Sequence, residues 1–355
     1  MRKPSGVRYG IRRAGGLTAL GEYDYDEKGG LAIQLVAIQM RLDVADFLTE
    51  DAFAAKIDGL LAQAAERLDP KDHTLVAFPE DVGLMLIAQG LRRELAGVSE
   101  VADAIRRVTR RFLVPAAWLK FRHGVSWVPA IFLLRHRTVA SAYFRVFSEA
   151  ARKYRVWIVA GSVPLPPYAV EAGRVLWEEG WLAPEVYNSS FLFGPDGKVV
   201  GRQDKVHLIE LEREAALDLT PGSVDRLRTF ETPFGRIGIA ICLDAFEDDV
   251  VDALTRQGAD ILVQPSANPG PWTAEQQTDW LRSSYRRVYL EQRFSYALNP
   301  MMHGTLWDIP FYGQSSIVTQ EDGTALHGYA DLGPMPGFHS VAASDREEEV
   351  LVAKV

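Results

Sequence analysis

Short apolar runs along the chain alternate with stretches whose hydrophobic residues recur every three or four positions. The first apolar run covers residues 31–40 and predicts a strand, and residues 50–67 have the spacing of a helix. A second apolar run at 74–78 ends in Pro79-Glu80. A strand, a helix and a strand in this order predict a β–α–β unit whose two strands are parallel.

The same alternation continues to the C-terminus. Residues 187–193 and 198–204 flank the turn sequence Gly194-Pro-Asp-Gly197 and predict a β-hairpin. Further strands are expected at 156–162, 260–264, 295–299, 313–320 and 349–355. Helices are expected at 88–112, 141–154, 246–258 and 273–293. The recurrence of strands and helices favours one large α/β domain over residues 31–355. Residues 1–30 show no sustained period, so we expect an N-terminal extension there.

One region departs from this pattern and predicts an insertion around residues 81–150. Within it, residues 112–134 are apolar and aromatic but are interrupted by Lys120, Arg122 and His123. We favour a buried or interface helix here. The alternative is an amphipathic segment, residues 112–137, that touches a membrane or caps the active site.

Composition narrows the class of protein. The chain is 47% hydrophobic and 24% charged, as expected for a globular protein. Its formal net charge of -8 argues against nucleic acid as the main partner. A single cysteine excludes an intramolecular disulfide and any metal site built on several cysteines. The N-terminus shows no secretory apolar segment and the chain no apolar run of membrane length, so we expect a cytoplasmic protein.

The one cysteine, Cys242, occupies a conspicuous position. Residues 236–241 before it are almost wholly apolar and predict a buried strand, and acidic residues after it open a helical pattern. A thiol at a helix N-terminus gains thiolate character, because the exposed backbone N–H groups favour an anion. The other interpretation is a small buried hydrophobic residue, which describes most free cysteines.

Two more chemically useful residues, Glu80 and Lys205, also follow apolar strands. In an open α/β sheet the carboxyl ends of strands face the ligand crevice, so such residues can converge. Taken singly, Glu80 fits a solvated carboxylate and Lys205 fits a lysine that protects a sheet edge. Together with Cys242, these two residues could supply the groups that a thiol nucleophile requires for catalysis. A carboxylate can deprotonate a thiol, and an ammonium can hold an oxyanion.

The segments around these three residues resemble the motifs of the nitrilase, or carbon–nitrogen hydrolase, superfamily. They read Leu75-Val-Ala-Phe-Pro-Glu80, Gly201-Arg-Gln-Asp-Lys205-Val-His-Leu208 and Phe234-Gly-Arg-Ile-Gly-Ile-Ala-Ile-Cys242-Leu-Asp244. Further matches in the expected order are Tyr187-Asn188-Ser189, Pro221-Gly222, Gly258-Ala-Asp260 and Pro265-Ser266-Ala267. The resemblance covers about residues 31–355.

The resemblance implies a four-layer α-β-β-α sandwich that assembles as a homodimer or higher homo-oligomer, with no metal and no organic cofactor. It assigns Glu80 as general base and acid, Lys205 as oxyanion stabiliser and Cys242 as nucleophile. The backbone N–H of Leu243 is then the second oxyanion donor. A second glutamate precedes Pro221-Gly222 in the family. Glu210, Glu212 and Glu214 compete for that role here, and we choose Glu214 because its spacing from Pro221-Gly222 is nearest to the usual one.

These assignments predict a thiol amidase that hydrolyses a non-peptide carboxamide through a Cys242 thioester. The alternatives are a nitrilase, an N-carbamoyl amidohydrolase or a non-catalytic binding protein on the same fold. Leu-Asp follows the cysteine, where nitrile hydrolysers of the family show Trp-Glu, and this favours amides. Trp272 and His303 are candidates for the substrate pocket, because each follows a strand expected to end near Cys242.

Overall fold

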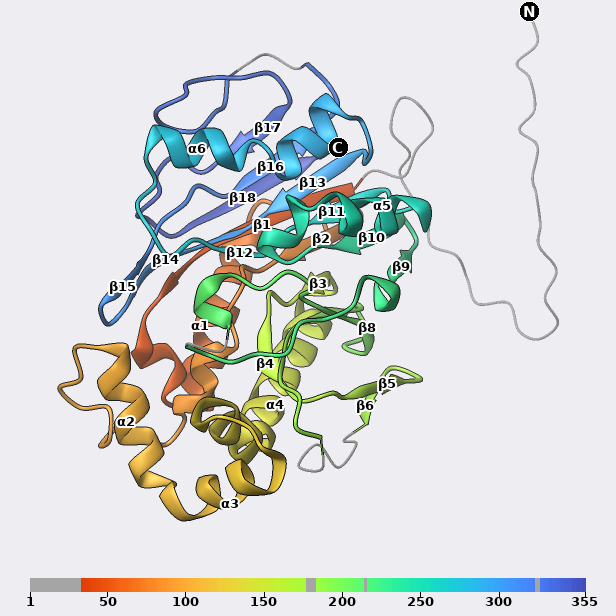
Figure 1. Ribbon diagram of the computed structural model, residues 1–355. Helices are drawn as coiled ribbons and strands as arrows, with labels where there is room; N and C mark the ends of the chain where they lie inside the picture. Colours follow the sequence, from red (N-terminus) through yellow and green to blue (C-terminus); the bar gives the residue numbers. More distant parts are fainter. Residues whose placement is uncertain (1–32, 177–182, 214–215, 323–325) are drawn as a thin grey trace, which may run out of the picture.

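Two β-sheets pack face to face in the computed structural model of the protein, and helices cover their outer faces (Figure 1). The structure describes residues 33–176, 183–213, 216–322 and 326–355. The extension predicted for residues 1–30 lies outside the described residues.

The larger sheet is built around β1 (Ile33–Leu42), which pairs in parallel with β2 (His73–Ala77) and antiparallel with β18 (Glu349–Lys354). The rest of this sheet comprises β12 (Ser266–Ala267), β14 (Met301–Leu306), β15 (Ile309–Phe311), β3 (Trp157–Val159), β7 (Tyr187–Phe193), β4 (Val163–Leu165) and β8 (Val199–Asp204). The predicted parallel β–α–β unit is confirmed, and so is the predicted hairpin, which β7 and β8 form.

The smaller sheet has the strand order β17-β16-β13-β11-β10-β9. These strands are β17 (Phe338–Val341), β16 (Ser316–Thr319), β13 (Tyr296–Asn299), β11 (Ile261–Val263), β10 (Gly235–Ile239) and β9 (Thr229–Thr232). A separate short hairpin joins β5 (Ala169–Glu171) to β6 (Arg174–Leu176).

The side-chain alternation of β1 explains why two cores form. Val36, Ile38 and Met40 pack into one core with α1 (Glu50–Ala65) and α4 (Trp127–Tyr154). Leu35 and Ala37 face the opposite way and pack against the smaller sheet. That second core also receives side chains from α5 (Asp248–Arg256) and α6 (Ala274–Trp280) on the outside of the smaller sheet. The four-layer α-β-β-α sandwich is thereby confirmed.

The helix predicted at residues 88–112 is wrong in its extent. The structure has a 3-10 helix, η2 (Leu84–Ala88), then turns, and only then α2 (Val101–Arg111). Gly90 and Gly97 adopt φ values of 73° and 67°, a left-handed conformation that ends a right-handed helix.

Two more helices differ from their predicted extents. The helix predicted at 141–154 begins much earlier, because α4 starts at Trp127 and follows α3 (Leu113–His123) after a turn at Gly124, whose φ is 68°. The helix predicted at 273–293 is divided into α6 and a π-helical turn, η7 (Arg286–Leu290). Buried Ser283 lies at this break and donates its hydroxyl hydrogen bond to the Trp280 carbonyl.

Candidate active site

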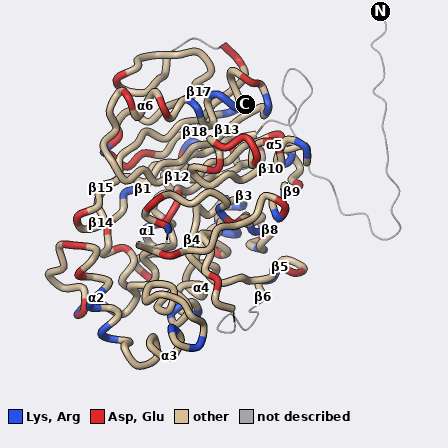
Figure 2. The backbone as a smooth tube through the Cα atoms, in the orientation of Figure 1, with Lys and Arg blue, Asp and Glu red and all other residues tan. Residues whose placement is uncertain are grey.

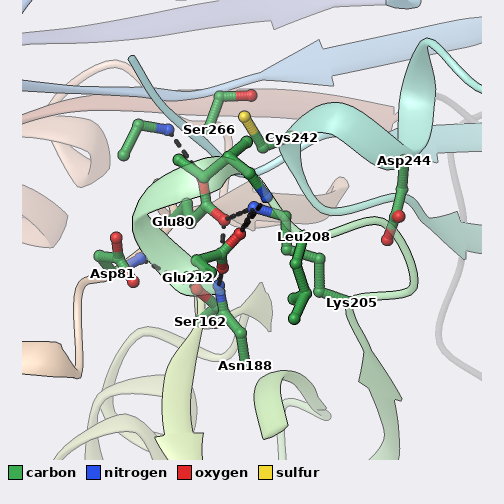
Figure 3. A network of polar contacts seen from close by, with 12 residues as sticks. Glu80, Asp81, Ser162, Asn188, Lys205, Leu208, Glu212, Cys242, Asp244 and Ser266 are labelled. Carbon is green, nitrogen blue, oxygen red and sulfur yellow. Dashed lines mark hydrogen bonds and ion pairs between the residues drawn. The ribbon is translucent and has the colours of Figure 1, made fainter. Parts of the chain in front are cut away.

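Lys205 is the centre of a buried polar network (Figure 3). Its ammonium Nζ lies 2.7 Å from Oε1 of Glu80 and 2.6 Å from Oε2 of Glu212. Lys205 is 0% exposed, Glu80 1% and Glu212 4%. Burying charges is costly unless each one is paired, so the network stands only while the cation remains between the two carboxylates.

Glu80 is held by the loop that follows β2. The chain turns beside Gly161, whose φ is 60°, and a Cβ atom at Gly161 would overlap the Pro79 carbonyl oxygen. This close approach requires glycine. The backbone N–H of Ala267 donates to Glu80 Oε2 at 3.1 Å, while Lys205 contacts Oε1. Both carboxylate oxygens therefore have fixed directions.

Asn188 on β7 joins the two glutamates. Its Nδ2 donates to Glu80 Oε1 at 3.0 Å and to Glu212 Oε1 at 2.8 Å. Glu212 ends the 3-10 helix η4 (Glu210–Glu212), and its Oε2 also accepts from the Ile209 backbone N–H at 2.9 Å. Asn188 and Lys205 thus hold two like-charged groups together.

Lys205 is positioned by backbone contacts at the end of β8. Its N–H donates to the Asn188 carbonyl at 2.8 Å, and its carbonyl accepts from the Gly222 N–H at 2.7 Å. A Cβ at Gly222 would stand 2.9 Å from that carbonyl oxygen, which explains the glycine of Pro221-Gly222.

Asp244 ties this segment to the cysteine two residues before it. Its carboxylate accepts from the His207 N–H at 2.7 Å and from the Val206 N–H at 3.1 Å. Burial raises the pKa of Asp244 to about 7 against the effect of these two donors.

Cys242 follows β10 with a φ of 51°, a left-handed conformation that strains a residue with a Cβ. Its N–H donates to the Pro265 carbonyl at 2.9 Å, and its carbonyl accepts from Gln264 Nε2 at 3.1 Å. Cys242 begins a 3-10 helix, η6 (Cys242–Ala245), and α5 starts only at Asp248. The predicted position at the N-terminus of an α-helix is therefore replaced by a short, strained 3-10 turn.

Electrostatics in the site differ from the sequence-based expectation of an acidic thiol. Burial and the nearby charge of Glu80 raise the pKa of the Cys242 thiol well above its usual range. Burial also raises the pKa of Glu80, against the lowering effect of Lys205. Burial alone would lower the pKa of Lys205, but Glu80 and Glu212 raise it well above its usual range. The resting site therefore has a protonated thiol beside a carboxylate of increased basicity.

The structure shows which of the described glutamates near Pro221-Gly222 contacts Lys205. The chosen candidate, Glu214, lies outside the described residues. Glu212, which was one of the three competing residues, contacts Lys205 directly. Among the residues that the structure describes, no group of three or more His, Cys, Asp or Glu side chains could hold a metal ion.

Trp272 is a buried side chain of the smaller sheet's outer core. Its Nε1 donates to Gln314 Oε1 at 3.0 Å, and its ring lies 5.1 Å from that of Tyr329 and 5.5 Å from that of Trp280. These contacts account for its burial by packing. Its role toward substrate stays a prediction.

His303 lines a cavity of about 580 Å³ together with Arg41 and Arg346, and Glu80, Lys205 and Cys242 are not among the lining residues. The role of His303 toward substrate stays a prediction. Its imidazole is buried, and burial lowers its pKa to about 4.

The lowered pKa of His303 predicts acid sensitivity. Folded His303 stays neutral while the unfolded chain takes up a proton below about pH 6.5, so stability is lost as pH falls from about 6.5 to 4. We expect this residue to account for up to about 3 kcal/mol of that loss. Urea unfolding of His303→Gln between pH 4 and 8 should show a shallower decline than the parent chain. Equal slopes would contradict the assignment.

Arg287 supports the turn that carries Cys242. It is fully buried, and its Nε and Nη2 donate to the carbonyls of Ala245 and Phe246 at 3.2 and 2.6 Å. Glu291 balances its charge at 3.1 Å. In the sequence this pair is marked only weakly, because Arg287-Val-Tyr-Leu-Glu291-Gln292 resembles the Arg-Ala-x-Glu-Asn stretch of the nitrilase superfamily only roughly. Asn188 belongs to the matched segment Tyr187-Asn188-Ser189, but that match did not assign it a role in the site. Nothing in the sequence pointed to a role for Gln264.

Comparisons with known proteins bear on the family and the fold. A sequence model of the carbon-nitrogen hydrolase family matches residues 36–331. The crystal structure of Saccharomyces cerevisiae Nit3, a member of branch 10 of the nitrilase superfamily, superposes with a TM-score of 0.54 at 18% identity. That superposition covers 91% of this chain and 89% of Nit3. The crystal structure of an amidase from Nesterenkonia sp. superposes with a TM-score of 0.53 at 17% identity, covering 91% of this chain and 89% of the amidase.

Curated relatives match a shorter part of the chain. Human omega-amidase NIT2 is 28% identical over 154 residues, which are 40% of this chain and 49% of the relative. Zebrafish (Danio rerio) omega-amidase NIT2 is 30% identical over 129 residues, or 35% and 40% of the two chains. The chain thus spans half or less of the length of these relatives. Because the family model covers most of the chain and the fold agrees, the protein belongs to the carbon-nitrogen hydrolase family.

Proposed function

We propose that the protein is a thiol amidase, which hydrolyses a non-peptide carboxamide through a thioester on Cys242. The observation that carries the proposal is the buried Glu80–Lys205–Glu212 network, which lies close enough to Cys242 that their charges shift the thiol pKa. The likeness to relatives named omega-amidases supports an amide over other carbon–nitrogen substrates.

In the first half-reaction Glu80 accepts the proton of the Cys242 thiol as the sulfur attacks the amide carbonyl carbon. The carbonyl oxygen gains negative charge, which the Lys205 ammonium and the Leu243 N–H stabilise. Leu243 suits this role because it is the second residue of η6, where an N–H has no acceptor within the helix. Glu80 then protonates the nitrogen, the carbon–nitrogen bond breaks, and ammonia or an amine leaves.

In the second half-reaction water replaces the amine. Glu80 removes a proton from the water as its oxygen attacks the thioester carbon, and the same two donors hold the oxyanion. The carbon–sulfur bond then breaks, the carboxylic acid leaves, and the proton on Glu80 returns to the sulfur. Each half-reaction therefore begins and ends with Glu80 ionised and able to act again.

Glu212 has a positioning role in this scheme. Its contact with Lys205 and its raising effect on the pKa of Lys205 keep the ammonium charged. Asn188 donates to both Glu212 and Glu80 and so fixes the two carboxylates on either side of the cation. The ammonium is therefore preorganised for the oxyanion before any substrate binds.

The proposal is tested with a panel of primary amides, nitriles and N-carbamoyl compounds. An amidase releases acid and ammonia in equal amounts from an amide, and an intact-protein mass spectrum during turnover shows one acyl group on Cys242. Hydrolysis of nitriles alone, or carbon dioxide release from carbamoyl compounds alone, would replace the proposal by one of those activities. No turnover and no adduct with any class would contradict it.

Changing Glu80 to glutamine tests the proton transfer. Glu80→Gln keeps an oxygen acceptor beside Lys205 but cannot take a proton, so turnover should fall by about 10²- to 10⁴-fold. The folded state should persist, because Glu212 still pairs with Lys205. Glu231→Gln is the control, because it makes the same change at a carboxylate that is 78% exposed and pairs with Arg236 outside this network. Equal losses in both variants would contradict the role of Glu80.

A further inference from the structure

The inserted helices α2 and α3, with the first turns of α4, form the end of the molecule farthest from the smaller sheet (Figure 1). α3 packs on α4 through Ala116 and Leu119, which are buried. The interpretation of residues 112–134 as a buried helix is therefore correct for one face of α3 only.

The opposite face of α3 is apolar and open to solvent. Val114, Trp118 and Phe121 follow one another at helical spacing and are 80%, 52% and 92% exposed. Leu113 and Trp127 adjoin them, and these five residues are called the α3 patch below. The described residues include nine exposed large hydrophobic side chains, and five of them belong to this patch. Such a concentration marks an interaction surface.

Basic residues accompany the α3 patch in the sequence. Residues 101–137 contain eight Arg and Lys and one carboxylate, Asp103, in a chain whose net charge is -8. Asp103 pairs with Arg106 and Arg107, and Glu94 pairs with Arg111. The excess positive charge is therefore carried by the remaining basic residues, Arg110, Lys120, Arg122, Arg135 and Arg137. Figure 2 shows the basic positions along α2 and α3. The Arg122 guanidinium lies 5.8 Å from the Trp118 ring centroid, and Lys120 Nζ lies 5.7 Å from that of Trp127. Each of these two cations therefore lies next to an aromatic ring. In such a pair the ring can enter an apolar layer while the cation stays at the polar surface of that layer.

We propose that the α3 patch docks on an anionic membrane surface. Aromatic rings that enter the boundary between headgroups and acyl chains, with Arg and Lys beside them on lipid phosphates, match the chemistry of such an interface. A second copy of this chain fits less well, because a two-fold contact would set the two basic surfaces against each other. No helix among the described residues is long and apolar enough to cross a membrane.

Vesicle flotation of the full chain tests this proposal, with phosphatidylcholine vesicles and with vesicles in which part of the lipid is phosphatidylserine. We expect binding to the anionic vesicles, at least tenfold less binding to the neutral ones, and release at high salt. The double variant Val114→Ser/Phe121→Ser should bind at least tenfold more weakly. Leu326→Ser is its control, because Leu326 is 70% exposed outside the α3 patch.

Charge reversal gives an independent test. Arg110→Glu/Arg122→Glu should lose the preference for anionic vesicles, whereas Arg282→Glu, at an exposed arginine in another part of the fold, should retain it. Cys242→Ala should float like the parent chain, so docking and hydrolysis fail separately. The proposal is overturned if the parent chain does not float, if Leu326→Ser loses as much binding as the patch variant, or if light scattering shows a dimer that Phe121→Ser dissociates.

Discussion

Replacing Lys205 by methionine is expected to destabilise the protein by about 3–5 kcal/mol and to lower turnover by at least about 10²-fold. The side chain is completely buried, and its removal leaves the carboxylates of Glu80 and Glu212 without their cation. If Lys205 stabilises the oxyanion as proposed, loss of that donor alone should lower kcat by about 10²- to 10³-fold. Urea unfolding measures the loss of stability, and an amide hydrolysis assay measures the loss of turnover.

The pH dependence of the Lys205→Met variant separates charge from packing. Without the ammonium, burial and the nearby charge of Glu212 raise the pKa of Glu80 further. When a carboxyl group has a higher pKa in the folded protein than in the unfolded chain, the folded protein binds the proton more tightly. The free energy of unfolding therefore increases as the pH falls. The deficit against the parent chain should therefore be larger at pH 8 than at pH 5. A pH-independent deficit would indicate lost packing instead.

A second substitution provides the matched control. In the Lys205→Met background, Glu212→Gln removes one of the two unpaired charges, so part of the lost stability should return. Activity should not return, because the oxyanion donor is still missing. If Glu212→Gln destabilises the Lys205→Met variant further, the two carboxylates are not held together by Lys205.

Much of the site was accessible from sequence because its residues sit at the ends of predictable elements. Glu80 follows β2, Lys205 follows β8 and Cys242 follows β10, and each of these strands is a recognisable run. The glycine of Pro221-Gly222 is also visible in the sequence, and its lack of a side chain allows the backbone to approach the Lys205 carbonyl. Short-range patterns determine these features, so a single sequence suffices to find them.

The missed features depend on contacts between distant parts of the chain. Counting residues back from Pro221-Gly222 favoured Glu214, which lies outside the described residues, whereas the structure places Glu212 against Lys205. A strand-to-helix junction predicted an acidic thiol at Cys242, but burial and Glu80 reverse the direction of its pKa shift. The local sequence around Cys242 shows neither that the thiol is buried nor that Glu80 lies beside it.

Helix α3 is a second case in which the local sequence could not decide the outcome. Its residues are apolar on two faces, so periodicity alone could not tell which face is covered. In the structure Ala116 and Leu119 are buried, whereas Trp118 and Phe121 are exposed. Only the packing of α3 on α4 decides between these faces.

The largest effect on activity is expected from Cys242→Ala, which removes the proposed nucleophile. Turnover of any amide should fall by about 10⁴-fold or more, and no acyl adduct should form. Because the chain has one cysteine, iodoacetamide should modify the parent protein once and the variant not at all. Residual turnover above a tenth of the parent rate would contradict a thioester mechanism.

Comparing Cys242→Ala with Cys242→Gly tests the strain at the nucleophile, independently of catalysis. Alanine keeps a Cβ at a φ of 51°, whereas glycine adopts that conformation readily. Glycine normally lowers stability, yet here the glycine variant should be about 1 kcal/mol more stable than the alanine variant. That result would mean that contacts such as those of Pro265 and Gln264 hold the thiol in a conformation that the backbone alone disfavours. A glycine variant less stable than the alanine variant would show that the turn stores no strain, and the position of the sulfur would then need no support from its neighbours.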